Sequence, residues 1–188
     1  QAFLAQLEGI AGELESLRHV VVLDGAGGLP GVARLGWDAL TRNDGRYAPV
    51  EVLGSDPAAM MFTSGTTGPS KGAVVPQNYQ VQMAEFICAM AGYTESDRLY
   101  NALPLFHGNA QSLSTMPALV SGASMVLAPR FSATRFWDEV RAFGCTEFNY
   151  IGGILPILLK ADPSPDDRNH PVRIMVGAGA AKAVHEAF

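Results

Sequence analysis

Residues 63–72 read Thr-Ser-Gly-Thr-Thr-Gly-Pro-Ser-Lys-Gly and lie between two apolar runs, residues 58–62 and 73–75. Apolar runs on both sides predict one buried strand before the loop and another after it. Glycine lets a backbone approach an anion closely without a Cβ clash. Successive backbone N–H groups can form a concave anion site, and lysine adds charge-assisted hydrogen bonds. The stretch therefore predicts a strand–loop–strand unit that binds a polyphosphate.

A linker, a structural turn and a Walker A loop are other interpretations of this stretch. A stretch rich in Gly, Ser and Thr can be a solvated linker or a structural turn, but the apolar flanks indicate that this one joins buried elements. A Walker A loop ends in Gly-Lys-Ser/Thr, whereas the order here is Ser70, Lys71, Gly72. The loop is thus predicted to bind phosphate in a different way, with a structural turn as the alternative.

The same stretch resembles the phosphate-binding signature of the adenylate-forming superfamily, which includes acyl-CoA synthetases, non-ribosomal peptide adenylation domains and beetle luciferases. The family pattern is Thr-Ser-Gly-Thr-Thr-Gly-x-Pro-Lys-Gly, and this chain has Pro69 and Ser70 where the family more often has x-Pro. The resemblance implies that the loop binds the β- and γ-phosphates of ATP, with Thr66 and Lys71 as catalytic residues. The residues that it assigns to the nucleotide here are Thr63, Ser64, Gly65, Thr66, Thr67, Gly68, Lys71 and Gly72.

The composition is that of a globular chain with one or two small domains. The 188 residues are 48% hydrophobic and 16% charged, which is unlike a disordered chain. The net charge of −5 argues against general nucleic-acid binding, because no cationic stripe is available. Residues 99–129 carry no charged side chain but contain prolines and polar residues, so they predict a buried core and not a membrane span.

The two cysteines, Cys88 and Cys145, lie far apart and match no metal-ligand spacing. Free cysteines are often buried as small apolar residues, so we expect two free thiols and no metal site. No signal-peptide pattern begins the chain. These features favour a cytoplasmic protein.

Alternating strand-like and helix-like runs predict an α/β fold with layered sheets and flanking helices. We expect strands at residues 19–23, 58–63, 72–75, 98–103, 125–127, 146–151 and 172–176, and helices at 78–90, 112–121, 132–143, 154–160 and 182–188. Asn78 and Ser132 are expected to cap their helices. Residues 26–57 are rich in turn signals and are expected to be mostly irregular. Residues 94–128 and 125–151 should form parallel crossover units.

A second candidate site is residues 103–110, Leu-Pro-Leu-Phe-His-Gly-Asn-Ala, between a predicted strand and a predicted helix. Open α/β sheets bind ligands at the carboxyl ends of their strands, but a lone histidine there can equally be a structural donor. The run Pro-Leu-Phe-His is similar to the second core motif of the superfamily, and the residues after it resemble the crotonobetaine/carnitine-CoA ligase branch. The likeness implies that His107 is a catalytic gate that orients the substrate, not a base.

Two further predicted strand ends are rich in small residues. Residues 176–181 are expected to form a turn into a helix, and the resemblance implies that Gly177, Ala178 and Gly179 contact adenine. It also implies an acyl pocket lined by Asn149, Tyr150, Gly152 and Gly153. Glycine's ordinary role in turns is the structural alternative in both places.

The resemblance implies that residues 1–188 are an internal part of the large N-terminal domain of an acyl-CoA synthetase-like fold, without its C-terminal domain. Residues 1–57 would form a leading segment with a strand and an irregular linker. Residues 58–188 would form the phosphate-loop, acyl-site and adenine-site subdomains. The chain starts at Gln1 in one helix-like pattern and stops at Phe188 in another, which also favours truncation.

The implied reaction is ATP-dependent activation of a small-molecule carboxylate through an acyl-adenylate, followed by thioester formation with CoA, as in fatty acid metabolism. Mg²⁺ would be bound through the phosphates or by a residue outside these 188. The family's Tyr-Gly-x-Thr-Glu motif is not in this sequence, so the isolated chain is expected to be inactive. An amino-acid adenylation domain, a non-catalytic nucleotide-binding module and an oligomeric structural fragment are the alternatives, and a homo-oligomer is possible for the enzyme as well.

Overall fold

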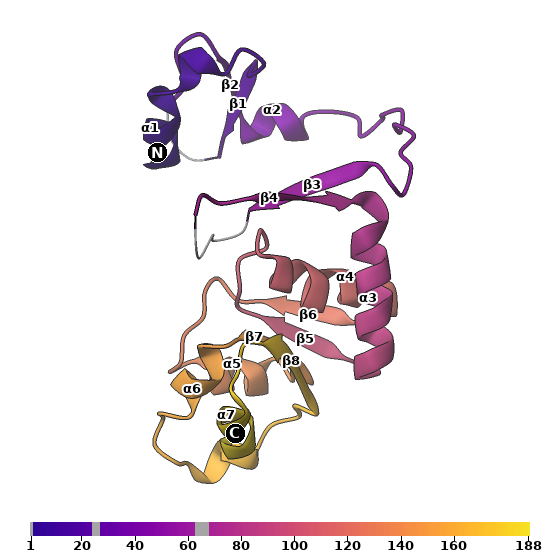
Figure 1. Ribbon diagram of the computed structural model, residues 1–188, viewed down its shortest axis with the longest axis vertical. Coiled ribbons are helices and arrows are strands. Elements are labelled where there is room, and N and C mark those ends of the chain that lie inside the picture. Colours follow the sequence, from indigo (N-terminus) through magenta and orange to yellow (C-terminus); the bar gives the residue numbers. More distant parts are fainter. Residues whose placement is uncertain (1, 24–26, 63–67) are drawn as a thin grey trace. The chain divides into compact units, whose positions relative to one another are not determined.

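The computed structural model describes residues 2–23, 27–62 and 68–188. The chain divides into two compact units, Gln1–Glu51 and Val52–Phe188. Each unit has its own strands and helices (Figure 1).

The first unit contains two short parallel strands, β1 (His19–Val22) and β2 (Ala33–Gly36). Helix α1 (Ala2–Glu8) precedes them, and α2 (Trp37–Thr41) follows β2 directly. The described residues 27–57 are mostly irregular, as expected, but β2 and α2 were not predicted. Pairing with the β-branched strand β1 gives β2 a hydrogen-bonded ladder, and such tertiary pairing overrides a weak local preference.

The second unit begins with an antiparallel hairpin. Strand β3 (Pro57–Phe62) pairs with β4 (Gly72–Pro76), and Phe62 lies opposite Gly72. This hairpin confirms the two strands predicted from the apolar flanks, but the prediction that both are buried was wrong, because only Val75 of their residues is buried. The register brings the two ends of the predicted phosphate loop side by side.

Helix α3 (Gln77–Ala91) follows the hairpin without a linker and ends at Gly92, whose φ is +63°. That conformation favours glycine. The prediction that Asn78 caps the helix was wrong, because the helix already begins at Gln77 and has no side-chain cap. The backbone N–H of Asn78 donates instead to the carbonyl oxygen of Gly54, at 2.9 Å.

Four parallel strands form the centre of the second unit, in the order β6-β5-β7-β8 (Figure 1). They are β5 (Arg98–Asn101), β6 (Ser124–Leu127), β7 (Glu147–Ile151) and β8 (Ile174–Ala178). The connection after β5 leads to one side of the sheet, and the connection after β7 leads to the other. Ligand crevices of open α/β sheets lie at such a switch point, outside the carboxyl ends of the strands.

Helices cover both faces of this sheet. They are α3, α4 (Met116–Ser121), α5 (Phe136–Ala142), α6 (Ile154–Leu158) and α7 (Lys182–Ala187). Leu99 of β5 packs with residues of α3 and α4 in one buried cluster, and its neighbour Tyr100 packs with Phe136 of α5 and Leu155 of α6 in another. Successive strand residues point to opposite faces, so the sheet is the middle layer of three. The predicted α/β class is confirmed.

Two helices differ from their prediction. The helix expected at 112–121 starts earlier, as a π-helix (Ala110–Thr115) that continues into α4, and π segments are frequent at functional sites. The helix expected at 132–143 is only α5: residues 133–135 form a turn before it, and Ser132 does not cap it. In the described parts of the chain, every helix is too short or too polar to cross a membrane.

Candidate functional site

The hairpin β3–β4 carries the predicted phosphate loop. Gly68 and Lys71 are exposed just before β4. A Cβ atom on Gly72 would lie 2.6 Å from the Sδ atom of Met60, so any larger residue there would force Met60 to move. Five predicted phosphate-binding residues lie outside the described residues: Thr63, Ser64, Gly65, Thr66 and Thr67.

His107 lies in the loop after β5, at the carboxyl edge of the sheet. Its side chain is exposed, and its Nδ1 accepts a hydrogen bond from the backbone N–H of Asn109 at 3.1 Å. An accepting Nδ1 places the imidazole proton on Nε2. The backbone carbonyl of His107 accepts the N–H of Gln111 at 3.1 Å. The loop thus forms a turn into the π-helix. The imidazole of His107 offers its Nε2–H group as a hydrogen-bond donor.

The side chain of Asn109 joins this loop to strand β7. Its Nδ2 donates to the carbonyl oxygen of Tyr150 at 3.0 Å, and its Oδ1 accepts the Nδ2 of Asn149 at 2.6 Å. Asn149 is 2% exposed, and its own Oδ1 has no hydrogen-bond partner among the described residues. Two segments that the sequence predicted separately, around His107 and around Asn149, therefore meet at the switch point between β5 and β7.

Tyr150 contributes its backbone to this edge and its side chain to the core. The residue is 3% exposed and packs in the cluster on the α5–α6 face. Its hydroxyl lies 2.7 Å from the Nε2 of His185, on α7. Burial raises the pKa of the Tyr150 hydroxyl. Of the two adjacent residues, Asn149 is therefore the one whose side chain joins the His107 loop.

The predicted adenine turn begins later than expected. Gly177 and Ala178 lie in strand β8, where they pair with Tyr150 and Ile151 of β7. The expectation that the strand ends at residue 176 was therefore wrong. The ladder with β7 extends the strand through residues whose small side chains suggested a turn, so only Gly179 of the three follows the strand.

Glycines at the ends of β7 and β8 differ in the space around them. A Cβ on Gly177 would lie 2.3 Å from the carbonyl oxygen of Tyr150, and one on Gly152 would lie 2.4 Å from that of Gly179. Gly179 also has a φ of +85°, which favours glycine. No atom lies within 4 Å of the Cβ position of Gly153. Close backbone packing thus explains Gly152 and Gly177, whereas open space remains beside Gly153.

The amino edge of the sheet holds an ion pair that sequence reasoning missed. Arg173 donates to both carboxylate oxygens of Asp97, at 2.6 and 2.9 Å, and Thr146 Oγ1 donates to the same carboxylate at 2.8 Å. These bonds, first of all those from Arg173, hold the pKa of Asp97 below its usual range. Arg173 also donates to the carbonyl oxygens of Ala91 and Gly92. The two charges are 76 residues apart in the chain, so no short motif could reveal them.

Glu147, the first residue of β7, is fully buried at this amino edge. Neither of its carboxylate oxygens has a hydrogen-bond partner among the described residues, and the same holds for the hydroxyl of Tyr93. Burial raises the pKa of Glu147 well above its usual value, and it also raises the pKa of Tyr93. The amino edge therefore contains a carboxyl group that favours its neutral form.

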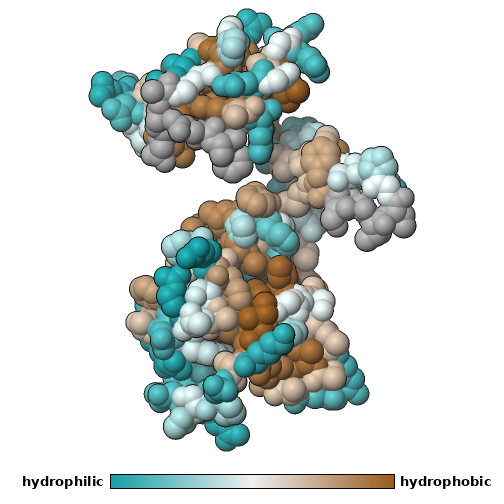
Figure 2. Space-filling model, turned by 90° about the vertical axis from the view of Figure 1, so that its left-hand side faces the viewer, coloured by the Kyte–Doolittle hydropathy of each residue, from teal (hydrophilic) through white to brown (hydrophobic). Residues whose placement is uncertain are grey.

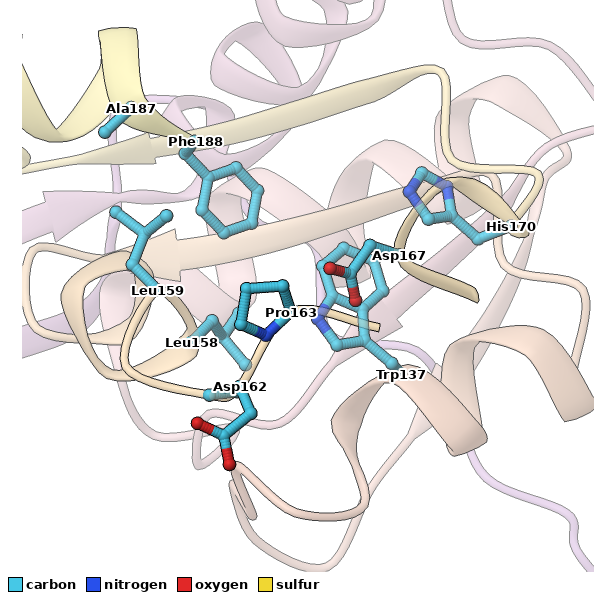
Figure 3. A pocket seen from close by; sticks show the side chains of 10 residues that line it. Trp137, Leu158, Leu159, Asp162, Pro163, Asp167, His170, Ala187 and Phe188 are labelled. Atoms are coloured by element: carbon cyan, nitrogen blue, oxygen red, sulfur yellow. The ribbon is translucent and has the colours of Figure 1, made fainter. Parts of the chain in front are cut away.

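A cavity of about 290 Å³ lies beside α5 and α6 (Figure 3). Trp137, His170, Phe188 and two carboxylates, Asp162 and Asp167, are among its lining residues. The rings of Trp137 and His170 stack with centroids 4.8 Å apart. None of the predicted site residues that the structure describes lines this cavity, so it is separate from the candidate site.

Apolar side chains are exposed on the hairpin and on α3. Met60, Phe62 and Val74 of the hairpin and Phe86 and Met90 of α3 are each at least 58% exposed. On the face that Figure 2 displays, hydrophobic surface (brown) also lies beside hydrophilic surface (teal). Because Phe62 directly precedes the predicted phosphate loop, apolar surface borders that loop.

No group of three or more His, Cys, Asp or Glu residues within residues 2–23, 27–62 and 68–188 is arranged to hold a metal ion. Cys88 and Cys145 are both free, and burial raises the pKa of the Cys145 thiol to about 11. The predicted free thiols are confirmed, although Cys88 is only half-buried.

Comparison with known proteins gives one consistent result. The model of a family described as AMP-binding enzyme matches residues 1–188. The chain is 36% identical over 163 residues to the human long-chain fatty acid transport protein 5, a match that covers 85% of this chain and 23% of that protein. It is 39% identical over 138 residues to the medium/long-chain-fatty-acid–CoA ligase FadD6 of Mycobacterium tuberculosis, covering 73% and 23%. The chain thus spans less than a quarter of the length of these curated relatives.

A similar structure has also been solved. A malonyl-CoA ligase in a ternary product complex with methylmalonyl-CoA and AMP superposes with a TM-score of 0.71 and 28% sequence identity. The match covers 95% of this chain and 39% of that chain.

Proposed function

The chain belongs to the AMP-binding enzyme family, and we propose that it forms the phosphate- and acyl-binding part of an acyl-CoA ligase. In the complete reaction a carboxylate oxygen attacks the α-phosphate of ATP, and acyl-adenylate and pyrophosphate are formed. The thiol of CoA then attacks the acyl carbon, and AMP leaves. The observation that carries this proposal is the β3–β4 hairpin, which presents Lys71 at the end of the hydroxyl-rich loop.

We assign the β- and γ-phosphates to the hairpin loop. Charge accumulates on pyrophosphate as it leaves, and positioned donors offset that charge. Lys71 would supply the ammonium group, and the backbone and hydroxyls of the preceding loop would supply neutral donors. We assign Thr66 a catalytic role together with Lys71. Gly68 and Gly72 would let the backbone approach the phosphates. Mg²⁺ would be bound through the phosphates or by a residue outside these 188.

We assign the acyl group to the switch point between β5 and β7, at the carboxyl ends of these strands. His107 offers an Nε2–H donor there, the Oδ1 of Asn149 is an acceptor without a partner among the described residues, and Gly153 borders open space. Gly152 and Tyr150 would contribute backbone groups to this acyl site. The adenine ring would lie beside the end of β8, at Gly177, Ala178 and Gly179.

A fatty acid is the carboxylate that the relatives favour. The names of both curated relatives include long-chain fatty acids, and apolar surface borders the phosphate loop at Phe62. The free thiols of Cys88 and Cys145 support a reducing, cytoplasmic compartment. We also propose that residues 1–188 alone do not complete the reaction, because they span less than a quarter of these relatives.

The test is ATP–pyrophosphate exchange in an enzyme that contains these 188 residues, with a panel of fatty acids and amino acids. Lys71→Ala should weaken pyrophosphate handling by about 1.5–3 kcal/mol, which is the size of a hydrogen bond to a charged group and corresponds to roughly 10- to 150-fold. Lys160→Ala, which removes an exposed lysine beyond α6, serves as the matched control. Equal exchange in both variants would refute the role of Lys71, and a preference for amino acids would refute the acyl-CoA ligase.

A further inference from the structure

Asn109 was not predicted as a site residue, yet it lies where the two predicted parts of the acyl site meet. Its backbone N–H donates to His107, its Nδ2 donates to the carbonyl oxygen of Tyr150, and its Oδ1 accepts from Asn149. One residue therefore contacts both the loop after β5 and the end of β7.

The sheet leaves a gap at this position that Asn109 bridges. The pairing of β5 with β7 ends at Tyr100 and Phe148, so Asn149 and Tyr150 extend beyond it. Strand β5 ends at Asn101, whose side chain forms a local turn with the backbone of Leu103, accepting at 3.0 Å and donating at 3.1 Å. Beyond this turn the ladder no longer ties the loop to β7, and the side chain of Asn109 makes that connection.

An amide is suited to this connection because it offers a donor and an acceptor at once. The Nδ2 of Asn109 meets a carbonyl oxygen that carries only lone pairs, and its Oδ1 meets the N–H of the Asn149 amide. A carboxylate in its place would keep the second bond and lose the first. Asn101 has the same functional group, but both of its bonds return to its own loop.

We propose that Asn109 is a positioning residue for His107, an inference that rests on the proposed ligase function. By fastening the loop to β7, its side chain keeps its backbone N–H on the Nδ1 of His107, and the ring presents Nε2–H outward. That donor matches an acceptor oxygen of the ligand, such as the carbonyl oxygen of an acyl group. The role of His107 is then to orient this oxygen and not to remove a proton.

The direct test is the tautomer of His107, measured by long-range ¹⁵N–¹H NMR of the ¹⁵N-histidine-labelled chain, with His107→Gln to assign its signals. Wild type should show the Nε2–H tautomer. In Asn109→Ala the loop loses both bonds to β7, so the two tautomers should be mixed. Asn109→Asp keeps the acceptor oxygen, so its population of the Nε2–H tautomer should lie between those of wild type and Asn109→Ala. Asn169→Ala, at an exposed asparagine far along the chain, should match wild type.

Wild type in the Nδ1–H tautomer would overturn the proposal, and so would an Asn109→Ala spectrum identical to that of wild type. If Asn109→Ala does not fold, Asn109→Asp is used in its place, and a spectrum identical to that of wild type would overturn the proposal. In the active enzyme, Asn109→Ala should lower kcat/KM for the carboxylate by about 10- to 100-fold, the size expected for a misplaced group, with KM for ATP unchanged. If this chain shows the expected tautomer but a longer enzyme that contains these 188 residues activates no carboxylate, the ligase function is refuted and the positioning role stays intact.

Discussion

The two edges of the four-stranded sheet use polar residues in opposite ways. At the amino edge, Asp97 and Arg173 bond each other, and Glu147 is buried as an acid that favours its neutral form. At the carboxyl edge, Asn109 and Asn149 meet through amide groups, and one amide oxygen has no partner among the described residues. At the amino edge the charges of Asp97 and Arg173 are thus paired within the protein and Glu147 favours its neutral form, while the carboxyl edge presents neutral amide groups.

This difference follows from the topology. Crossovers of a parallel sheet diverge at the carboxyl ends of neighbouring strands and open a crevice there. The amino ends of the same strands receive the connections from the helices and are closed by them. The ion pair at the amino edge should therefore serve stability, and the polar residues at the carboxyl edge should serve binding.

The largest effect on stability should come from Asp97→Ala. It leaves Arg173 and Thr146 without their acceptor, and removing one partner of a buried pair costs about 3–5 kcal/mol. Arg173 is 43% exposed and can be rehydrated, so we expect a loss of about 2–3 kcal/mol in urea unfolding. Asp138→Ala breaks an exposed ion pair of similar length, with Arg141, and should cost under about 1 kcal/mol.

The pH dependence sharpens this test. The folded-state pKa of Asp97 lies below its ordinary value of 3.8, so its contribution is present above pH 3.8 and is lost as pH falls through the folded-state pKa. The difference between wild type and Asp97→Ala should shrink over that acid range. A difference that stays constant down to complete protonation would contradict the assigned ion pair.

A smaller effect should separate two adjacent glycines at the carboxyl edge. Gly152→Ala places a Cβ against the backbone of Gly179 and should destabilise the fold by about 1–3 kcal/mol, as overpacking does. Gly153→Ala meets no atom within 4 Å at a helical φ of −76°, so it should be neutral or stabilise by up to about 1 kcal/mol. Thermal unfolding of both variants checks this.

The same pair tests the acyl pocket. If Gly153 borders the acyl group, Gly153→Ala should reduce the longest fatty acid accepted in exchange assays without loss of stability. Equal stability of the two variants would show that Gly152 is not held by Gly179, and the distinction between packed and open glycines would fail.

The smallest effect should be a gain in stability from Glu147→Gln. The folded-state pKa of Glu147 is raised above its ordinary value of 4.5, so wild type is fully stabilised below pH 4.5 and loses stability as pH rises towards the folded-state pKa. Glutamine cannot ionise. The melting temperature of the variant should therefore exceed that of wild type at neutral pH, with a difference that vanishes near pH 4. Glu85→Gln, at an exposed position of α3, should show no such pH-dependent gain.

Local patterns predicted the elements whose signals are contained in a few residues. The apolar runs on both sides of the loop predicted the hairpin, and the helix expected at 78–90 is α3. Strand β2 has no such signal, since it is a strand only because β1 lies beside it. The same limit explains why β8 was predicted to end two residues too early, at Val176.

For the site, sequence reasoning found His107 and Asn149 by resemblance but could not show that they meet. Their contact depends on the strand order, in which β5 and β7 are neighbours although β6 lies between them in the chain. Asn109 follows His107 by two residues, and a Gly-Asn pair in a loop is an ordinary turn signal. Its hydrogen bonds to Asn149 and Tyr150 of β7 distinguish Asn109 from a solvated turn residue, and only the structure reveals them.

The anchoring of α3 by Arg173 has a mechanical consequence. The last turn of this helix is held through the carbonyl oxygens of Ala91 and Gly92, while its first residue continues directly from β4. A helix of 15 residues is about 22 Å long. At that length, a tilt of about 5° about the anchored end would carry the hairpin end through about 2 Å, so the bonds from Arg173 to the last turn also bear on where the hairpin lies.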